Sequence, residues 1–260
     1  MGTIGSLQIG IMTIRMEYMS KRQFIEDRRK KNQRQKTLML TLMIGGLVIV
    51  AAAITVAFIS SSRVSIPQND IVQPDIGLPG LVDRNALGDP NAPVVIEEYS
   101  DFGCSHCADF ALGTKKLIEQ EYIESGQVYL IFHSVGGLLG SPATLQAAEG
   151  AYCAADQNAY WPFHDLIFAN QVALFQNRSA DISGTLGQFA EILELNLDQF
   201  DACLAERKYK GLTAQDEVDA VQKGIDGTPT FLVNGVTLVG NQPFENFQQL
   251  IEEELAKAGE

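Results

Sequence analysis

The stretch VVIEEYSDFGCSHCADF, residues Val94–Phe110, joins a run of β-branched residues to two cysteines that stand three positions apart. The apolar run at Val94–Tyr99 predicts a buried strand. Apolar residues at helical spacing after Cys104 predict a helix, and residues 127–135 predict a second strand. A helix between two strands is typical of a βαβ unit with parallel strands. Cys104 and Cys107 therefore lie where a strand gives way to a helix.

The remainder of the body predicts helices first and strands last. Residues 141–224 have helical periodicity almost throughout. Two short apolar runs follow, joined by Asn234-Gly235, which is the strongest short hairpin signal. An amphipathic helix is expected from Phe244 to about Lys257. This order predicts an α/β protein with the thioredoxin fold and an inserted all-helical domain at about 141–224. The helices expected in the insert are Ser141–Gln157, Tyr160–Gln171, Gly184–Leu195, Leu197–Lys208 and Leu212–Lys223.

Charge divides the chain into two parts. The 260 residues carry a net charge of −13, but residues 1–63 hold ten Lys or Arg against three Asp or Glu. The other 197 residues hold 9 basic and 29 acidic side chains. Such an acidic body disfavours nucleic acid and anionic membrane as partners. The basic N-terminal part needs a separate explanation.

That explanation is the uncharged segment that follows it. The apolar run Leu38–Ile59 is 22 residues long, and a spanning helix needs about 20. Basic residues precede the run, so the positive-inside rule keeps the N-terminus in the cytoplasm and exports the body. Residues 37–60 are therefore predicted to be a transmembrane signal anchor in the cell membrane. A cleaved signal peptide and a buried core helix are the alternatives.

The domain boundaries follow from these patterns. Residues 1–36 are predicted to be a basic cytoplasmic segment, and residues 61–92 a polar, proline-containing linker. Residues 93–260 form the single folded domain. Four cysteines in an exported domain fit an oxidising compartment.

The cysteine pair is suited to thiol–disulfide exchange. A thiol attacks only as the thiolate, and an unperturbed cysteine has a pKa of about 8.5. At the start of a helix, unsatisfied N–H groups and the helix dipole favour a thiolate on Cys104. His106 can add a charge or a hydrogen bond when it is protonated. Cys107 lies one turn on, close enough to form a disulfide with Cys104 and to resolve a mixed disulfide.

Other interpretations of the pair require features that this sequence lacks. A zinc site usually needs a second pair of ligands at regular spacing, and the other cysteines here are single. Haem attachment needs a histidine directly after the second cysteine, where the chain has Ala108. A purely structural disulfide stays open as an alternative. No metal or other cofactor is expected.

A second element is Gly227-Thr228-Pro229-Thr230, at the start of a predicted strand. Proline is unusual there because it removes a ladder donor. A cis bond before Pro229 would turn the backbone of Thr228 toward the redox pair, where it could bind an extended substrate. Only about 5–6% of X–Pro bonds are cis in folded proteins, so the residues alone favour a trans turn.

Three stretches, VVIEEYSDFGCSHCADF, YWPFHDLIFANQ and GIDGTPTFLVNG, resemble the membrane-anchored form of the DsbA-like thiol:disulfide oxidoreductases of the thioredoxin superfamily. The resemblance covers about residues 86–258. It implies that Cys104 is the nucleophile, Cys107 the resolving cysteine and His106 a stabiliser of the thiolate. It also implies a cis bond between Thr228 and Pro229.

The sequence departs from the pattern of the family at one position. The best-known oxidases of the family have C-P-H-C, and Ser105 replaces that proline here. The dipeptide between the cysteines tunes the redox poise, so the strength of this chain as an oxidase is open. The fold is unaffected by this difference.

Glu98 resembles the buried carboxylate that the family places behind the resolving cysteine, where it can relay a proton. Glu97 points to the opposite face of the strand, and a solvated glutamate at a strand end is the alternative for either residue.

The remaining cysteines and histidines have simpler explanations. Cys153 and Cys203 stand 50 positions apart in the predicted insert and are expected to form a structural disulfide, with two buried free thiols as the alternative. His133 and His164 are interpreted as structural histidines.

The leading hypothesis is an extracytoplasmic oxidase that transfers the Cys104–Cys107 disulfide to unfolded or reduced exported proteins that contain cysteines. The family implies reoxidation by a quinone-linked membrane protein. A reductase or isomerase of the same fold is the first alternative. A non-catalytic, membrane-anchored binding module with structural disulfides is the second.

Overall fold

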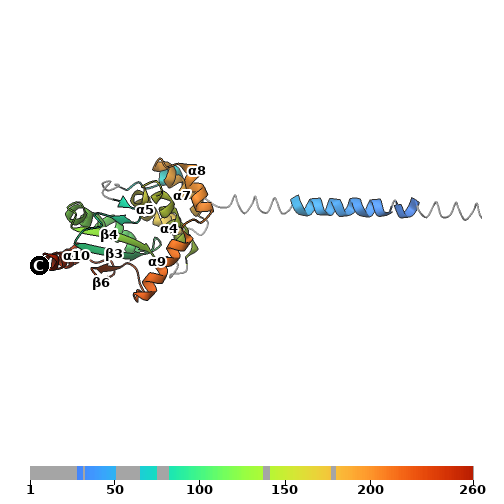
Figure 1. Ribbon diagram of the computed structural model, residues 1–260. Coiled ribbons are helices and arrows are strands. Elements are labelled where there is room, and N and C mark those ends of the chain that lie inside the picture. The colour runs from blue at the N-terminus through green and yellow to red at the C-terminus, as the bar shows by residue number, and fades with distance from the viewer. Residues whose placement is uncertain are drawn as a thin grey trace, which may run out of the picture. The chain divides into compact units, whose positions relative to one another are not determined.

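The computed structural model of the chain describes residues 28–31, 33–50, 65–74, 82–136, 141–176 and 180–259. The chain divides into two compact units, Met1–Ser62 and Arg63–Glu260. The second unit contains the sheet and the helices that surround it (Figure 1).

In the described part of the chain, six strands form one sheet in the order β1-β2-β4-β3-β5-β6. β3 and β4 are parallel, which confirms the predicted βαβ unit, and the other neighbours pair antiparallel. The strands are β1 Val82–Asp83, β2 Ala86–Leu87, β3 Val94–Ser100, β4 Val128–Ser134, β5 Thr230–Val233 and β6 Val236–Val239.

The predicted hairpin between β5 and β6 is also present. Asn234 and Gly235 both have positive φ, 45° and 85°, as the two central residues of a type I′ turn require. The Asn234 side chain also accepts a hydrogen bond from the Val95 N–H, at 2.9 Å, which ties the turn to β3. A local sequence signal and a long-range contact therefore fix the same turn.

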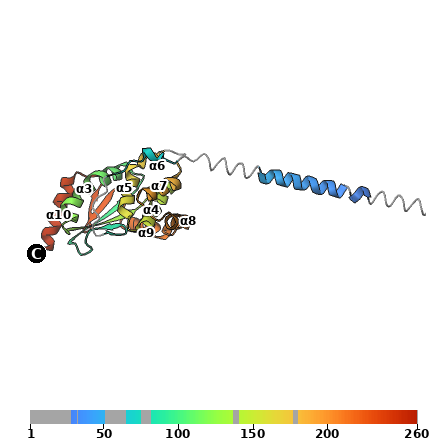
Figure 2. The same cartoon turned by 90° about the horizontal axis from the view of Figure 1, so that it is seen from above.

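The helices follow the predicted order with shifted ends and one addition: the predicted helix Tyr160–Gln171 ends at Ala169, and a short helix that was not predicted begins at Gln171. The insert holds α4 Pro142–Ala155, α5 Tyr160–Ala169, α6 Gln171–Phe175, α7 Ile182–Ile192, α8 Leu197–Ala205 and α9 Lys210–Gln222, and α10 Phe244–Ala258 closes the chain. The insert helices lie at the opposite end of the unit from α10 in both views (Figures 1 and 2).

The crossover helix between β3 and β4 is less regular than expected. It runs through α2 Ser105–Asp109, a π-helical turn at Phe110–Thr114, α3 Lys115–Ile118 and a second π-helical turn at Glu119–Ile123. π-Helical turns inside a helix are rare and are frequent at functional sites.

The two faces of β3 carry different environments. Glu98 pairs with Phe231 of β5, and Phe231 packs against Phe110 and against Phe247 of α10. The crossover helix and α10 therefore cover this face. Tyr99 points to the other face, where its hydroxyl donates to Asp219 of α9, at 2.5 Å.

The predicted linker at 61–92 is partly wrong. β1 and β2 lie in this range, and β2 extends the sheet by pairing with Leu130 and Ile131 of β4. Residues 65–74, which we call the strap, also belong to the folded unit, because Ile66 and Ile71 are buried in its core. Isolated apolar residues in a polar, proline-containing stretch do not show in its composition, so their burial was not predicted. Residues 61–64 and 75–81 lie outside the described residues.

The predicted second disulfide is confirmed. Cys153 of α4 bonds to Cys203 of α8 across a sequence separation of 50 residues, with their Cα atoms 5.9 Å apart. Both sulfurs are buried in the core of the insert. The bond joins two helices that the chain connects only through α5, α6 and α7.

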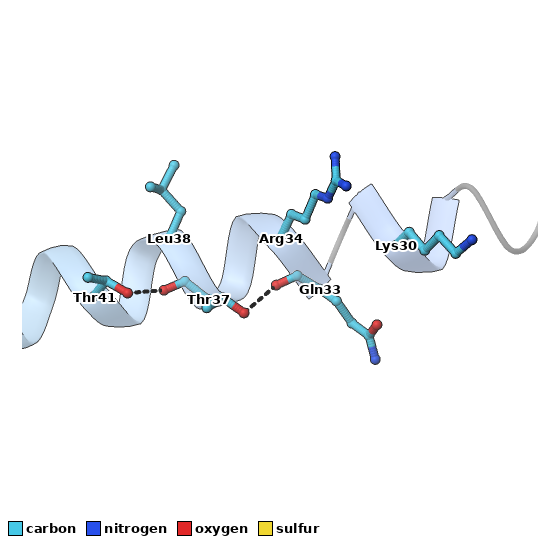
Figure 3. Close-up of a pocket in the computed structure, with 6 residues that line it drawn as sticks. All are labelled: Lys30, Gln33, Arg34, Thr37, Leu38 and Thr41. Carbon is cyan, nitrogen blue, oxygen red and sulfur yellow. Dashed lines mark hydrogen bonds between the residues drawn. The ribbon is translucent and has the colours of Figure 1, made fainter.

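The first unit is helical over residues 28–31 and 33–50. Lys30 and Arg34 are among the residues that line a shallow hollow along this helix (Figure 3). The Thr37 hydroxyl donates to the Gln33 carbonyl, at 2.9 Å. Among the residues that the structure describes, no helix has the length and apolar character needed to cross a membrane. Residues 1–27 and the second part of the predicted anchor, 51–60, lie outside the described residues.

Candidate functional site

Cys104 occupies the N-cap position of α2. Its φ and ψ of −83° and 123° are extended, and the helix starts at the next residue. Cys104 is half-buried, whereas Cys107 is completely buried, and both are free thiols. The expected strand–loop–helix setting is therefore present, and only the first sulfur of the pair is accessible to another molecule.

The loop before the helix is held by its own polar groups. The Cys104 N–H donates to the Asp101 carbonyl, at 2.9 Å, and the Gly103 N–H donates to the Asp101 carboxylate, at 3.0 Å. A Cβ atom on Gly103 would lie 2.8 Å from a methyl carbon of Thr144, so any larger residue would require the Thr144 side chain or the loop to shift. The position of Cys104 is thus fixed from both sides.

The environment of Cys104 favours its thiolate. A hydrogen bond from the Cys107 thiol is the main reason that the pKa of Cys104 falls to about 5, against the opposing effect of burial. The Thr228 hydroxyl and the backbone N–H groups of Cys107 and His106 lower this pKa further. The two backbone donors point at this sulfur because Cys104 precedes the first helical turn.

Cys107 shows the opposite behaviour. Burial raises the pKa of the Cys107 thiol well above its ordinary value, and the hydrogen bond to Cys104 raises it further. The Ser100 hydroxyl opposes the shift only in part. The proton therefore stays on the buried sulfur of Cys107, and the half-buried sulfur of Cys104 carries the thiolate.

The imidazole of His106 lies at the surface. Its side chain is 73% exposed, and its Nδ1 atom is 3.9 Å from the Asp109 carboxylate. The contact with the thiolate that the structure provides comes from its backbone N–H. The predicted role of the His106 side chain stays a prediction.

The Thr228-Pro229 loop lies directly beside the cysteine pair. The peptide bond between the two residues is cis. The Cys104 thiol donates to the Thr228 carbonyl, at 3.4 Å, although 124 residues separate them. β5 follows the loop at once and pairs with β3, so Thr230 lies opposite Tyr99. The sheet thus brings together two motifs that are distant in the sequence.

Glu98 lies behind the pair, on the covered face of β3. It is completely buried, and neither of its carboxylate oxygens has a hydrogen-bond partner in the described residues. Burial raises the pKa of Glu98 to about 8, while the Ser100 hydroxyl and the Lys115 ammonium lower it by less. Ser100 thus influences the pKa of Glu98 and of Cys107 alike.

Sequence reasoning missed a buried ionic network next to this carboxylate. The Lys115 ammonium lies 3.1 Å from the Asp165 carboxylate and 2.8 Å from that of Glu119, and its side chain is 1% exposed. Burial alone would lower the pKa of Lys115, but the two carboxylates raise it. His164 bonds to the same Asp165, at 2.8 Å, and burial lowers the pKa of His164 to about 4. The i, i+4 spacing of Lys115 and Glu119 was the only available signal.

The opposite face of β3 carries a second polar cluster. Glu97, His133 and Asp219 bring together three side chains of metal-ligand type, with their ligand atoms within 4.8 Å of one another. The Lys223 ammonium contacts both carboxylates, at 3.1 Å in the case of Asp219. Lysine thereby supplies the positive charge that the two acids require.

The fold and the paired cysteines define a thioredoxin-fold protein with a dithiol site. The thioredoxin family model matches residues 82–253, and the chain belongs to this family. Disulfide bond formation protein D of Bacillus subtilis is 26% identical over 200 residues, which cover 72% of this chain and 82% of that protein. The crystal structure of alpha-DsbA1 from Wolbachia pipientis aligns with a TM-score of 0.61 and 25% identity, over 74% of this chain and 98% of that one. Both matches extend over most of the length of the other protein.

A higher identity occurs in a longer protein. The Na(+)/H(+) antiporter NhaA 3 of Salinispora tropica is 36% identical over 162 residues, which cover 62% of this chain. The chain spans only 23% of the length of that relative. The antiporter name therefore refers to the whole of that longer protein, and this chain matches only part of it.

Proposed function

We propose that this chain is a thiol:disulfide oxidoreductase that acts as an oxidase and forms disulfides in exported, cysteine-containing proteins. The low pKa of Cys104, beside a buried and protonated Cys107, carries the proposal. A stabilised thiolate favours the reduced form of the pair, which makes its disulfide a stronger oxidant. The names of the disulfide bond formation protein and of alpha-DsbA1 support the same chemistry.

The reaction starts from the Cys104–Cys107 disulfide. A substrate thiolate attacks the accessible Cys104 sulfur, the bond between the two cysteines breaks, and Cys107 leaves as a thiolate. A second substrate thiolate then attacks the mixed disulfide and displaces Cys104. The substrate loses two electrons and gains a disulfide, and the enzyme becomes the dithiol.

Glu98 is suited to supply the proton that Cys107 takes up. The carboxyl group retains a proton near neutral pH because its pKa is about 8. The Ser100 hydroxyl is close enough to lower the pKa of both Glu98 and Cys107. An ordinary carboxylate would be ionised at pH 7 and would have no proton to give. In this proposal Glu98 is the proton relay of the site.

Thr228 and Pro229 are the proposed substrate-binding loop. The Thr228 carbonyl lies 3.4 Å from the Cys104 sulfur, so a peptide bound along this backbone would bring its own cysteine to that sulfur. Backbone pairing of this kind suits substrates of many sequences, because it uses groups that every residue carries.

The location of the reaction belongs to the same proposal. Residues 37–60 anchor the chain in the membrane as a single pass, with the basic N-terminus in the cytoplasm and the catalytic unit outside. A quinone-linked membrane protein reoxidises the pair, as the resemblance to the DsbA-like proteins implies. The Cys153–Cys203 disulfide supports an oxidising compartment.

The reduction potential of the Cys104–Cys107 pair tests the direction of electron flow. The full-length chain is equilibrated in glutathione buffers, and the pair is followed while Cys153–Cys203 stays closed. We expect a potential toward the DsbA value of about −120 mV. A value near that of thioredoxin, about −270 mV, would favour the reductase or isomerase alternative. Failure to form the disulfide would favour the binding module.

A further inference from the structure

Gln171, the first residue of α6, reaches from the helical insert into the redox loop. Its side-chain amide donates one hydrogen bond to the Phe102 carbonyl and one to the Cys104 carbonyl, both at 2.7 Å. The residue is buried, at 7% exposure. Both N–H groups of this amide therefore bond to backbone carbonyls of the redox loop, one of them that of Cys104 itself.

These two bonds act on the backbone that positions the sulfur. The Cys104 carbonyl also accepts the first helical hydrogen bond, from the Ala108 N–H, at 3.1 Å. The N–H groups that stabilise the Cys104 thiolate belong to His106 and Cys107, in the same turn. Their direction relative to the sulfur depends on the extended ψ of Cys104. The Gln171 amide holds the carbonyl of Cys104 itself and that of Phe102, two residues earlier in the same loop.

The residue before Gln171 fixes the junction between α5 and α6 to the strap. The Asn170 side chain accepts from the Val72 N–H and donates to the Val72 carbonyl, both at 2.8 Å. It also donates to the Leu166 carbonyl in α5, at 2.8 Å. Two neighbouring side chains therefore tie the strap and the redox loop to the same turn of the insert.

We propose that Gln171 is a positioning residue for Cys104, and that the strap supports it through Asn170. The Gln171 amide donates to backbone carbonyls and acts on the sulfur only through them. It keeps the start of α2 in the orientation in which the backbone donors face the thiolate. The proposal deepens the proposed function and rests on the role of Cys104 as the attacking thiolate.

The test is a titration of the Cys104 thiolate by its absorbance at 240 nm. The full-length chain is used with the Cys104–Cys107 pair reduced and the insert disulfide intact. Gln171→Met keeps the length of the side chain and loses both donors. We expect its titration to move upward by about one pH unit, a tenfold loss of thiolate at low pH. Gln176→Met, an exposed change at the end of the same helix, is the matched control and should titrate as wild type.

Two further variants keep the proposal falsifiable. Gln171→Asn retains the amide but is one methylene shorter, so it should shift the titration in the same direction by a smaller amount. Asn170→Ala releases the strap and leaves Gln171 intact, and a smaller upward shift is expected there too. Each variant is titrated only within the pH range where circular dichroism shows a folded protein.

The outcomes separate this proposal from the proposed function. A wild-type thiolate that titrates near the ordinary cysteine value would overturn the role of Cys104 itself. A low wild-type value with unchanged Gln171→Met and Gln171→Asn titrations would overturn only the positioning role, even if both variants melt at lower temperature. An unchanged Asn170→Ala titration would remove the part assigned to the strap.

Discussion

The Cys104 sulfur lies 3.4 Å from the carbonyl oxygen of Thr228, a residue that follows it by 124 positions. The two meet because β3 and β5 pair antiparallel immediately beside the redox loop. The Thr228 carbonyl can accept from the thiol, and the Thr228 hydroxyl stabilises the thiolate. One residue thus contacts the sulfur in both of its protonation states.

Replacement of Thr228 by valine tests the contribution of the hydroxyl. The variant keeps the shape of the side chain and the backbone carbonyl but loses the donor to the thiolate. We expect the pKa of Cys104 to rise by less than about one unit, because other donors remain. Thiolate absorbance measures the shift, and Thr237→Val in β6 serves as the control. An unchanged titration would assign no role to the hydroxyl.

Replacement of Cys107 by alanine should have a larger effect. The hydrogen bond from its thiol is the main cause of the low pKa of Cys104, so its loss should raise that pKa more than Thr228→Val does. The variant also cannot resolve a mixed disulfide, and a covalent adduct with a cysteine peptide should accumulate. Mass spectrometry of the adduct checks this outcome. Rapid release of the peptide from the variant would contradict the assigned roles.

The buried carboxyl group of Glu98 should give stability a distinct pH dependence. The folded protein keeps the Glu98 proton up to about pH 8, whereas the ordinary value for the group is 4.5. Between these values the folded state binds more protons than the unfolded state, so the free energy of unfolding falls as pH rises. A glutamine at this position removes that fall because it does not ionise.

The free energy of unfolding of Glu98→Gln should therefore exceed that of wild type at pH 8, with a difference on the order of 3 kcal/mol. The difference should shrink toward pH 5. Urea denaturation at both pH values measures it, and Glu124→Gln, at an exposed position, is the control. Parallel pH profiles for Glu98→Gln and wild type would show that the carboxyl group is not held in its neutral form.

The disulfide of the insert should affect stability and leave the redox pair unchanged. Replacement of both Cys153 and Cys203 by alanine opens a loop of about 50 residues, which is expected to cost about 4 kcal/mol of stability. The reduction potential of Cys104–Cys107 should stay at its wild-type value. Thermal unfolding and glutathione titration measure the two effects. A shifted potential would show that the insert disulfide takes part in the redox chemistry.

Local signals made the central part of this fold predictable. The β-branched run of β3, the helix start at Cys104 and the Asn234-Gly235 turn each act over a few residues, and each was found in its predicted place. The cis bond before Pro229 was different, because only the resemblance to a family pointed to it. The Cys153–Cys203 bond followed from the expected compartment together with the count of cysteines.

Features that depend on tertiary contacts could not be predicted from the sequence. β2 has only two residues, Ala86 and Leu87, and it forms because they pair with β4. A lysine in a helix is expected to be solvated, so the burial of Lys115 was not predicted. Its charge is compensated by Asp165 of another helix. Nothing in the local sequence of Gln171 indicates that its amide bridges two carbonyls of a loop 67 positions away.

The unequal burial of the cysteines has a practical consequence for chemical labelling. In the dithiol form, Cys107 is enclosed and Cys153 is bonded to Cys203, which leaves Cys104 as the one cysteine of four with an accessible sulfur. Its low pKa keeps that sulfur reactive in mildly acidic solution, where other thiols are largely protonated. A maleimide dye should therefore label the unmutated protein at Cys104 alone, which allows fluorescence measurements without an engineered cysteine.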